Sequence, residues 1–277
     1  MQTLINYSRK YGSNPELVLA GGGNTSMKEN GVLYVKGSGC ALSSIEKDNF
    51  VAMDLSKLRA IVNNAYPDND SAREAAFLAD MSAAKLPGEE AKRPSVEALL
   101  HALFPQRYVL HLHPALVNGL TCGVDGEKVA AELFPEAVWV EACKPGFTLA
   151  KLLADKLDGR NTVLLQNHGV FFAADSEEEL AALLNGMLAK LNTRVTASMP
   201  EVLPDVDISK PFTPDHIVYC GLGPVLPDTD NARLLYKDAQ KINWYSSFFG
   251  GPLPLKSELV DFITHWEAES YRRKKSN

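Results

Sequence analysis

Apolar and polar positions along the chain follow two different periods, one typical of helices and one typical of strands. Apolar residues recur three or four positions apart in some segments and in short continuous or alternating runs in others. The predicted helices cover residues 1–12, 56–63, 71–85, 95–104, 146–159 and 177–195. The predicted strands cover residues 50–55, 107–113, 137–142 and 161–174, with two more in 16–39 joined by a turn at 28–31. This alternation predicts an α/β or α+β fold.

The pattern changes beyond residue 197. Residues 198–230 are rich in proline and predict an extended connection, and the last 45 residues or so predict helices. We therefore expect a domain over residues 1–197, followed by a connection and a helical C-terminal extension over residues 198–277.

Composition and charge narrow the possible functions. Apolar residues make up 45% of the 277 residues and the net charge is −6, which is typical of a globular protein and unfavourable for nucleic acid. The four cysteines form no C-x-x-C pair, which argues against a cysteine zinc site or a disulfide framework and favours the cytoplasm. No signal peptide or membrane span is predicted.

Two histidines interrupt the apolar run VLHLHPALVNG, residues 109–119. Side chains two residues apart on a strand point to the same side, so His111 and His113 can approach one ion together. His168 follows another apolar strand and precedes a glycine, where the backbone can approach a ligand closely. Three imidazoles would leave one position of a tetrahedral zinc site open, as in catalytic sites. The alternative is a buried core histidine with a hydrogen-bonded neighbour.

A carboxylate precedes the histidine strand by one element. Glu97 falls in the first turn of the predicted helix 95–104, where it could complete a metal shell or accept a proton. Its alternative role is compensation of the helix dipole. His101 lies one turn further along the same helix face, and we assign it a structural or supporting role.

Two glycine-rich stretches, GGGNTS at 21–26 and KGSGC at 36–40, match neither a Walker A loop nor the dinucleotide fingerprint. Free amides and hydroxyls of this kind can instead form a cradle for a small phosphate, and the helix that begins near Ser95 could add its N-terminus. Each stretch taken alone could equally be a tight turn. The candidate groups are Asn24, Thr25, Ser26, Lys36, Ser38, Gly39 and Ser95.

Five motifs in order, GGGNTS, KGSG, RPSVE, HLHP and NHGVFFAADSEEEL, give the chain a family resemblance over about residues 14–195. The chain resembles the class II aldolase/adducin family. Within that family it is most similar to the aldolase part of bifunctional rhamnulose-phosphate aldolase/alcohol dehydrogenase proteins, which similarly carry R-P-S-x-E, L-L-H-A-L and the T-P-D-H found here at 213–216.

The resemblance implies a central, mostly antiparallel sheet between helical layers, and a fourfold tetramer with active sites at the subunit interfaces. It implies Zn²⁺, or another divalent metal, held by His111, His113 and His168, with Glu97 as catalytic base and possible fourth ligand. It further implies that the substrate phosphate contacts Asn24, Thr25, Ser38, Gly39 and Ser95.

The implied activity is zinc-dependent cleavage of a ketose 1-phosphate into dihydroxyacetone phosphate and an aldehyde. A sugar-phosphate 4-epimerase, a dehydratase of the methylthioribulose-phosphate type and a non-catalytic assembly module remain alternatives. Val96 stands where family aldolases commonly have a second hydroxyl residue, so one phosphate contact is missing. No dehydrogenase part follows, so we expect a stand-alone protein or a partner of a separate enzyme. The candidates for the tyrosine acid are Tyr219, Tyr236 and Tyr245.

Overall fold

A seven-stranded mixed sheet forms the centre of the computed structural model, which describes residues 1–276. The strand order is β3-β2-β1-β4-β7-β6-β5, and every neighbouring pair is antiparallel except β5 and β6. The strands are β1 (Asn24–Glu29), β2 (Val32–Lys36), β3 (Phe50–Asp54), β4 (Tyr108–Leu112), β5 (Val138–Val140), β6 (Thr162–Leu165) and β7 (Gly169–Ala174). The expected mostly antiparallel sheet is confirmed.

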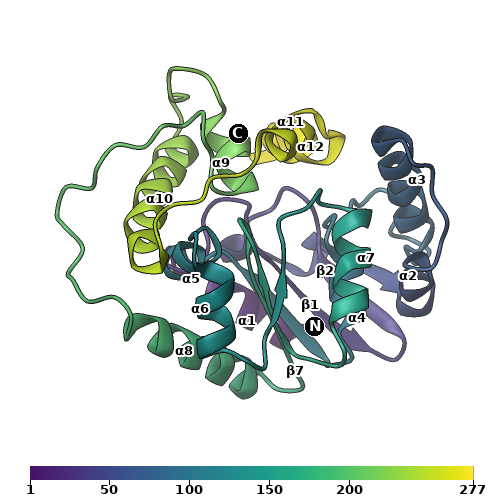
Figure 1. Cartoon of the computed structure of the whole chain (residues 1–277). Coiled ribbons are helices and arrows are strands. Elements are labelled where there is room, and N and C mark those ends of the chain that lie inside the picture. Colours follow the sequence, from purple (N-terminus) through teal and green to yellow (C-terminus); the bar gives the residue numbers. More distant parts are fainter. Residues whose placement is uncertain (277) are drawn as a thin grey trace.

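Helices cover both faces of this sheet, so the architecture has three layers (Figure 1). One face packs against α1 (Gln2–Gly12), α5 (Ala115–Thr121), α6 (Gly126–Leu133) and α8 (Glu177–Asn192). The other packs against α2 (Leu55–Ile61), α3 (Asp70–Ala83), α4 (Ala98–Leu103) and α7 (Phe147–Lys156). Strand β4 serves both cores, because Leu110 and Leu112 face the first group of helices while Val109 faces the second.

The segment 161–174 is a hairpin of two strands rather than one continuous strand. Strands β6 and β7 pair antiparallel through a tight turn, in which Asn167 has a φ of 57°. The apolar pattern did not predict helices α5 and α6. All seven residues of α5 are buried, so this helix lacks the one-sided apolar stripe by which a surface helix is recognised.

The proline-rich segment predicted to be extended contains a helix, α9 (Pro214–Cys220), so that prediction was wrong over these seven residues. Thr213 and Pro214 start it as the residue before the helix and the first helical residue, where the missing proline N–H costs nothing. The other C-terminal helices are α10 (Asp230–Ser246), α11 (Ser257–His265) and α12 (Glu267–Ser276), and short 3-10 turns occur at Leu42–Ser44, Lys47–Asn49 and Ser247–Phe249.

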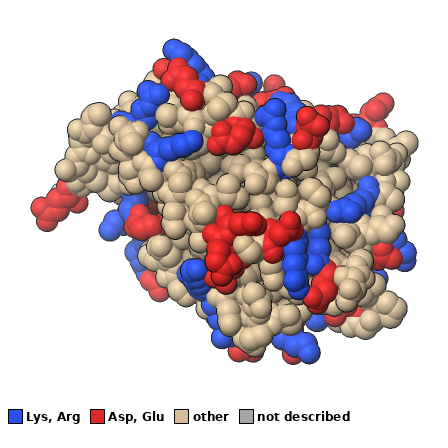
Figure 2. All heavy atoms as spheres, turned by 90° about the horizontal axis from the view of Figure 1, so that it is seen from below, with Lys and Arg blue, Asp and Glu red and all other residues tan. Residues whose placement is uncertain are grey.

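The C-terminal helices pack on the sheet domain rather than extending away from it. Helix α10 contacts α5, and α9 contacts α10, α11 and α12. Figure 1 shows α9, α11 and α12 gathered at one end of the sheet. In the described part of the chain, no helix has both the length and the apolar character needed to cross a bilayer. Figure 2 shows acidic and basic side chains interspersed on the face seen from below.

Candidate metal centre

Three imidazoles from two separate chain segments converge at the end of β4. His111 lies in β4, His113 follows that strand directly, and His168 lies in the turn between β6 and β7. Ring centroids are 4.7 Å apart for His111 and His113, 5.0 Å for His111 and His168, and 5.2 Å for His113 and His168. One nitrogen of each ring lies within 4.8 Å of the other two, so the group could hold a metal ion.

The sheet fixes the histidines from both sides. Strand alternation turns His111 and His113 to the same face, and the Phe171 ring stacks on His111 with a centroid distance of 4.0 Å. Gly169 lies against both rings, because a Cβ there would be 2.7 Å from His113 Cδ2 and 3.3 Å from His111 Cε1. A side chain at this position would therefore force the rings apart.

Hydrogen bonds determine which ring nitrogens face the centre. His111 Nδ1 donates to the carbonyl of Val170 (3.0 Å), and His113 Nδ1 donates to Asp215 Oδ2 (2.6 Å). Both Nε2 atoms therefore carry lone pairs in the neutral rings, and these atoms are 2.9 Å apart. Burial lowers the pKa of His111 well below 6.5 and that of His168 to about 4, so these two rings are neutral at pH 7. A divalent cation fits this set of donors.

Glu97 completes the inner face of the cluster. Its Oε1 is 3.4 Å from His111 Nε2 and 3.4 Å from His168 Nε2, and it is a buried atom without a hydrogen-bond partner. Burial alone would raise the pKa of Glu97, but attraction to His111 and His168 when these rings carry a proton, together with the hydrogen bond from Asn24, lowers it to about 2. A buried oxygen left without a donor is costly unless a cation or substrate satisfies it.

A chain of hydrogen bonds holds Glu97 in place from the opposite side. Asn24 Nδ2 donates to Glu97 Oε2 (2.5 Å), and Asn24 Oδ1 is bound by His101 Nε2. The other ring nitrogen of His101 accepts from Ser26 Oγ at 2.7 Å. His101 is thus a neutral imidazole that orients Asn24, in keeping with the supporting role expected for it. Glu97 itself immediately precedes α4, rather than lying in its first turn.

This buried imidazole has a measurable consequence for stability. Burial lowers the pKa of His101 from 6.5 to about 3 in the folded protein. Between these values the unfolded chain binds a proton that the folded chain does not. The free energy of unfolding should therefore fall as the pH is lowered from about 6.5, by up to about 1.4 kcal/mol per pH unit from this residue.

Urea unfolding of the metal-free protein at pH 6 and pH 5 tests this expectation. The His101→Gln variant should show a shallower pH dependence than the parent by about one proton. His265→Gln, at an exposed position on α11, is the control and should leave the slope unchanged. Equal slopes in His101→Gln and the parent would contradict a neutral buried imidazole.

Only some of the residues predicted to bind phosphate lie together in the structure. A cleft beside the histidines is lined by Asn24, Ser38, Gly39 and Ser95, with Glu97 at its inner side. Ser95 Oγ is held by the Glu97 amide (3.2 Å) and by Asn24 Nδ2 (3.3 Å). The Ser38 amide is already used, because it donates to the carbonyl of Arg93. The Ser38 hydroxyl group, Gly39 and Lys36 are then the groups of KGSG that line the cleft.

Thr25 lies outside the cleft, whereas Lys36 lines it with an amine that is already hydrogen-bonded. The Thr25 side chain lies on the opposite face of β1, where its hydroxyl is 2.7 Å from Ser8 Oγ of α1. It therefore does not line the cleft, because neighbouring strand residues point to opposite faces. Lys36 Nζ donates to the carbonyls of Gly21 and Gly23, so this buried lysine ties the first glycine-rich loop to β2.

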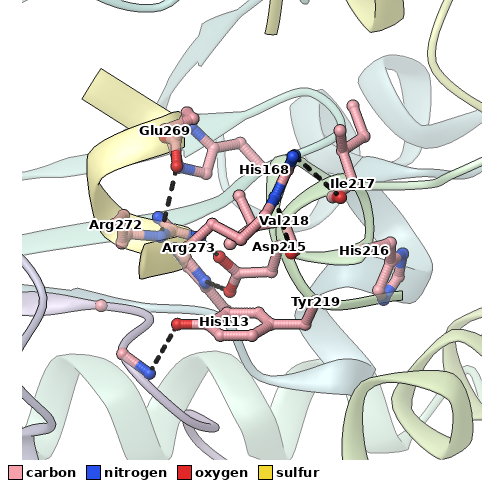
Figure 3. Close-up of polar contacts among 12 residues, drawn as sticks. His113, His168, Asp215, His216, Ile217, Val218, Tyr219, Glu269, Arg272 and Arg273 are labelled. Carbon is pink, nitrogen blue, oxygen red and sulfur yellow. Dashed lines mark hydrogen bonds and ion pairs between the residues drawn. The ribbon is translucent and has the colours of Figure 1, made fainter. Parts of the chain in front are cut away.

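Residues of the C-terminal extension also reach the site, and sequence reasoning missed most of them. Asp215 contacts His113, Arg272 donates to Asp215, and Glu269 lies beside Arg272 (Figure 3). Glu269 and Arg272 also line the cleft. The T-P-D-H motif was the available signal for Asp215, whereas no spacing in the sequence marked the other two. Burial would raise the pKa of Asp215, but the charge of Arg272 and the hydrogen bond from His113 hold it well below its usual range.

The three candidate tyrosine acids occupy different places. Tyr219 lies next to the cleft, because its hydroxyl accepts from the Gly21 amide at 3.0 Å. Tyr236 contacts Asp205 at the surface, and Tyr245 lies on α10 beside Gly119. Of the three, Tyr219 is the one in contact with a residue of the site.

Comparison with known proteins was made by sequence and by structure. The family model "Class II Aldolase and Adducin N-terminal domain" matches residues 2–187. A Bacillus subtilis (strain 168) protein named "Uncharacterized oxidoreductase YuxG" is 30% identical over 192 residues, which is 64% of this chain. The match spans only 27% of that relative's length.

Among solved structures, the N-terminal class II aldolase domain of a conserved Thermoplasma acidophilum protein is similar, with a TM-score of 0.60 and 28% identity. That similarity covers 69% of this chain and 92% of the other. YgbL from Escherichia coli has a TM-score of 0.51 and 17% identity, covering 72% of this chain and 90% of the other. The latter is a likeness of fold alone.

Proposed function

Because the chain belongs to the class II aldolase and adducin family, we propose that it is a zinc-dependent aldolase that cleaves a ketose 1-phosphate into dihydroxyacetone phosphate and an aldehyde. The observation that carries this proposal is the convergence of His111, His113 and His168 around the unpartnered oxygen of Glu97. Non-catalytic use of the fold would not require this set of buried donors.

The donor set suits zinc, because three imidazole nitrogens leave the fourth position of a tetrahedral site open. When bound there, the cation would polarise the substrate carbonyl and stabilise the negative charge that develops on its oxygen. The chain's own residues supply the binding of the phosphate and the movement of the proton.

Glu97 is the proton carrier in this scheme. Cleavage removes the proton from the C4 hydroxyl, breaks the C3–C4 bond and returns a proton to C3, so no net proton is consumed. The Oε1 atom of Glu97 faces the histidines and has no hydrogen-bond partner, so it is available to take up a proton and to return it. Asn24 holds the other oxygen, so only Oε1 is free to exchange protons.

Phosphate binding is assigned to the cleft that adjoins the metal centre. The hydroxyl groups of Ser38 and Ser95 and the Gly39 backbone line it within one pocket with Glu97 and His168. Val96 also lines the cleft and offers no hydroxyl, so we expect fewer side-chain contacts to phosphate than in relatives with a second hydroxyl there.

A product screen tests the proposal. Protein loaded with Zn²⁺ is offered a panel of ketose 1-phosphates, and triose phosphate is detected by a coupled reduction. We expect triose phosphate from at least one substrate, none after chelator treatment, and recovery on adding Zn²⁺. The matching unphosphorylated ketoses are the control and should react much more slowly.

Other products would point to other members of the family. Return of an epimeric pentulose phosphate without triose would indicate the 4-epimerase. Loss of water without carbon–carbon cleavage would indicate the dehydratase. Stoichiometric metal binding with no turnover of any sugar phosphate would contradict an enzyme and favour the assembly module.

We also propose a fourfold tetramer in the cytoplasm, with residues 1–197 as the catalytic domain and residues 198–277 as an extension to it. The free thiols of Cys40, Cys122, Cys143 and Cys220 suit a reducing compartment. Light scattering of the purified chain tests the assembly. The word oxidoreductase in the name of the Bacillus relative belongs to a protein of which this chain matches about a quarter.

A further inference from the structure

One ring nitrogen of the metal-ligand candidate His113 is held by a carboxylate from the C-terminal extension. His113 Nδ1 lies 2.6 Å from Asp215 Oδ2, and only 8% and 5% of these side chains are exposed. Asp215 belongs to α9, about 100 residues further along the chain than His113. The contact therefore joins the candidate metal centre to the segment that the sequence predicted to be an extended connection.

The second oxygen of Asp215 is occupied as well. Arg272 of α12 donates to Asp215 Oδ1, and its Nε lies 3.2 Å from Glu269 Oε2 (Figure 3). Because Asp215 Oδ1 accepts from the Arg272 guanidinium, the carboxylate is ionised and has no hydrogen to donate. Its Oδ2 can therefore only accept a hydrogen bond from His113. The proton therefore sits on Nδ1 of His113, and its Nε2 lone pair is turned toward His111.

The backbone leaves room for this contact. A Cβ at Gly22 would lie 2.6 Å from Asp215 Oδ2 and 3.1 Å from His113 Nδ1, so a side chain at position 22 would push the two apart. A hydrogen bond also joins this loop to α9, because the Gly21 amide donates to Tyr219 Oη. Loop, helix and histidine thus meet in a close-packed arrangement around one hydrogen bond.

From this geometry we propose that Asp215 is the positioning residue of the metal centre, which holds His113 in the tautomer and orientation that bind a divalent cation. Asp215 acts through His113 and does not itself touch metal or substrate. The inference rests on the proposed metal site and adds that the C-terminal extension is part of it. A carboxylate behind a metal-bound histidine typically contributes 10- to 100-fold to metal affinity.

The Asp215→Asn variant separates positioning from mere packing. An amide has nearly the same shape as the carboxylate, but its NH₂ group can donate to Nδ1 and thereby favour the tautomer with hydrogen on Nε2. That hydrogen would point at the metal position. We expect Co²⁺, as a probe with visible absorption, to bind Asp215→Asn about 10- to 100-fold more weakly than the parent, and with an altered absorption spectrum.

Asp238→Asn is the matched control. Asp238 lies 3.3 Å from His216 Nε2, so it forms a second buried aspartate–histidine pair in the same extension, with no contact to the three clustered histidines. Both variants and the parent are prepared metal-free and titrated with Co²⁺ against a competing chelator. Circular dichroism confirms that each is folded. The control should match the parent in affinity and in spectrum.

Four outcomes are decisive. A folded Asp215→Asn protein that binds Co²⁺ within twofold of the parent, with the same spectrum, overturns the inference. If this variant does not fold, Gly22→Ala takes its place, because the added methyl displaces the same contact, and parental affinity there overturns the inference equally. A parent that binds no Co²⁺ overturns both this inference and the metal site. Normal Co²⁺ binding without turnover of any sugar phosphate rejects only the proposed function.

Discussion

Replacing His168 by alanine is expected to remove the bound metal and nearly all turnover. This imidazole is the one donor that comes from the β6–β7 turn, and its loss leaves the adjacent pair of His111 and His113 with an open side. Two neutral imidazoles hold zinc much less tightly than three, so we expect metal affinity to fall by on the order of 100-fold or more.

When the metal concentration is limiting, the turnover rate of His168→Ala should fall by a larger factor than its metal affinity. Stabilisation of developing charge by a metal ion contributes several kcal/mol, and about 4 kcal/mol corresponds to about 10³-fold in rate. The fold should survive, because His168 lies in a turn and its side chain is 14% exposed. Metal content by elemental analysis and the rate of triose phosphate release are the two measurements.

His265→Ala is the control for this variant, since its side chain is 75% exposed on α11. It should keep both metal content and rate. If His168→Ala retained one zinc per chain and the parental rate, the convergence of the two chain segments would have no part in the chemistry.

Glu97→Gln should lower kcat by about 10³-fold while leaving metal binding nearly intact. Glutamine has almost the same shape and can still accept from Asn24 Nδ2, so the side chain keeps its position. It cannot take up a proton at Oε1, however, and general acid–base catalysis typically contributes 10²- to 10⁴-fold. Three imidazoles remain, so Co²⁺ should still bind.

Steady-state kinetics with saturating Zn²⁺ and a parallel Co²⁺ titration distinguish the two effects. Glu136→Gln, at an exposed position before β5, serves as the matched control and should behave like the parent. A Glu97→Gln protein that keeps kcat within tenfold would exclude this carboxylate as the proton carrier. One that loses metal and activity together would make it chiefly a ligand.

Local patterns predicted most of the elements, because the features that encode them lie close together in the sequence. The two-residue period of the strand predicted over 107–113 implied that His111 and His113 point to the same side. The structure has both rings on one side of the sheet. Capping residues marked the start of α8, where Ser176 accepts from the Glu179 amide. Helix α5 left no such pattern, because it is buried all round.

For the candidate site, too, the sequence predicted some residues and not others. The motifs identified the three histidines and Glu97, since metal ligands and bases are restricted to few residue types. They did not indicate that Thr25 faces α1, although the period of the strand implies that Asn24 and Thr25 cannot both face the cleft. They also did not indicate that Arg272 reaches Asp215, the hydrogen-bond partner of His113, because no short-range pattern links α12 to α9.

The sequence by itself therefore determined the family, the layered α/β class and the residue types that can bind a metal. Only the tertiary structure decided which atoms meet. Periodicity, caps and motifs depend on neighbours within a few residues, whereas the contact of His113 with Asp215 is a long-range contact made by packing. Such contacts depend on how all the helices and strands pack around the hydrophobic cores, and no single segment of the sequence specifies that packing.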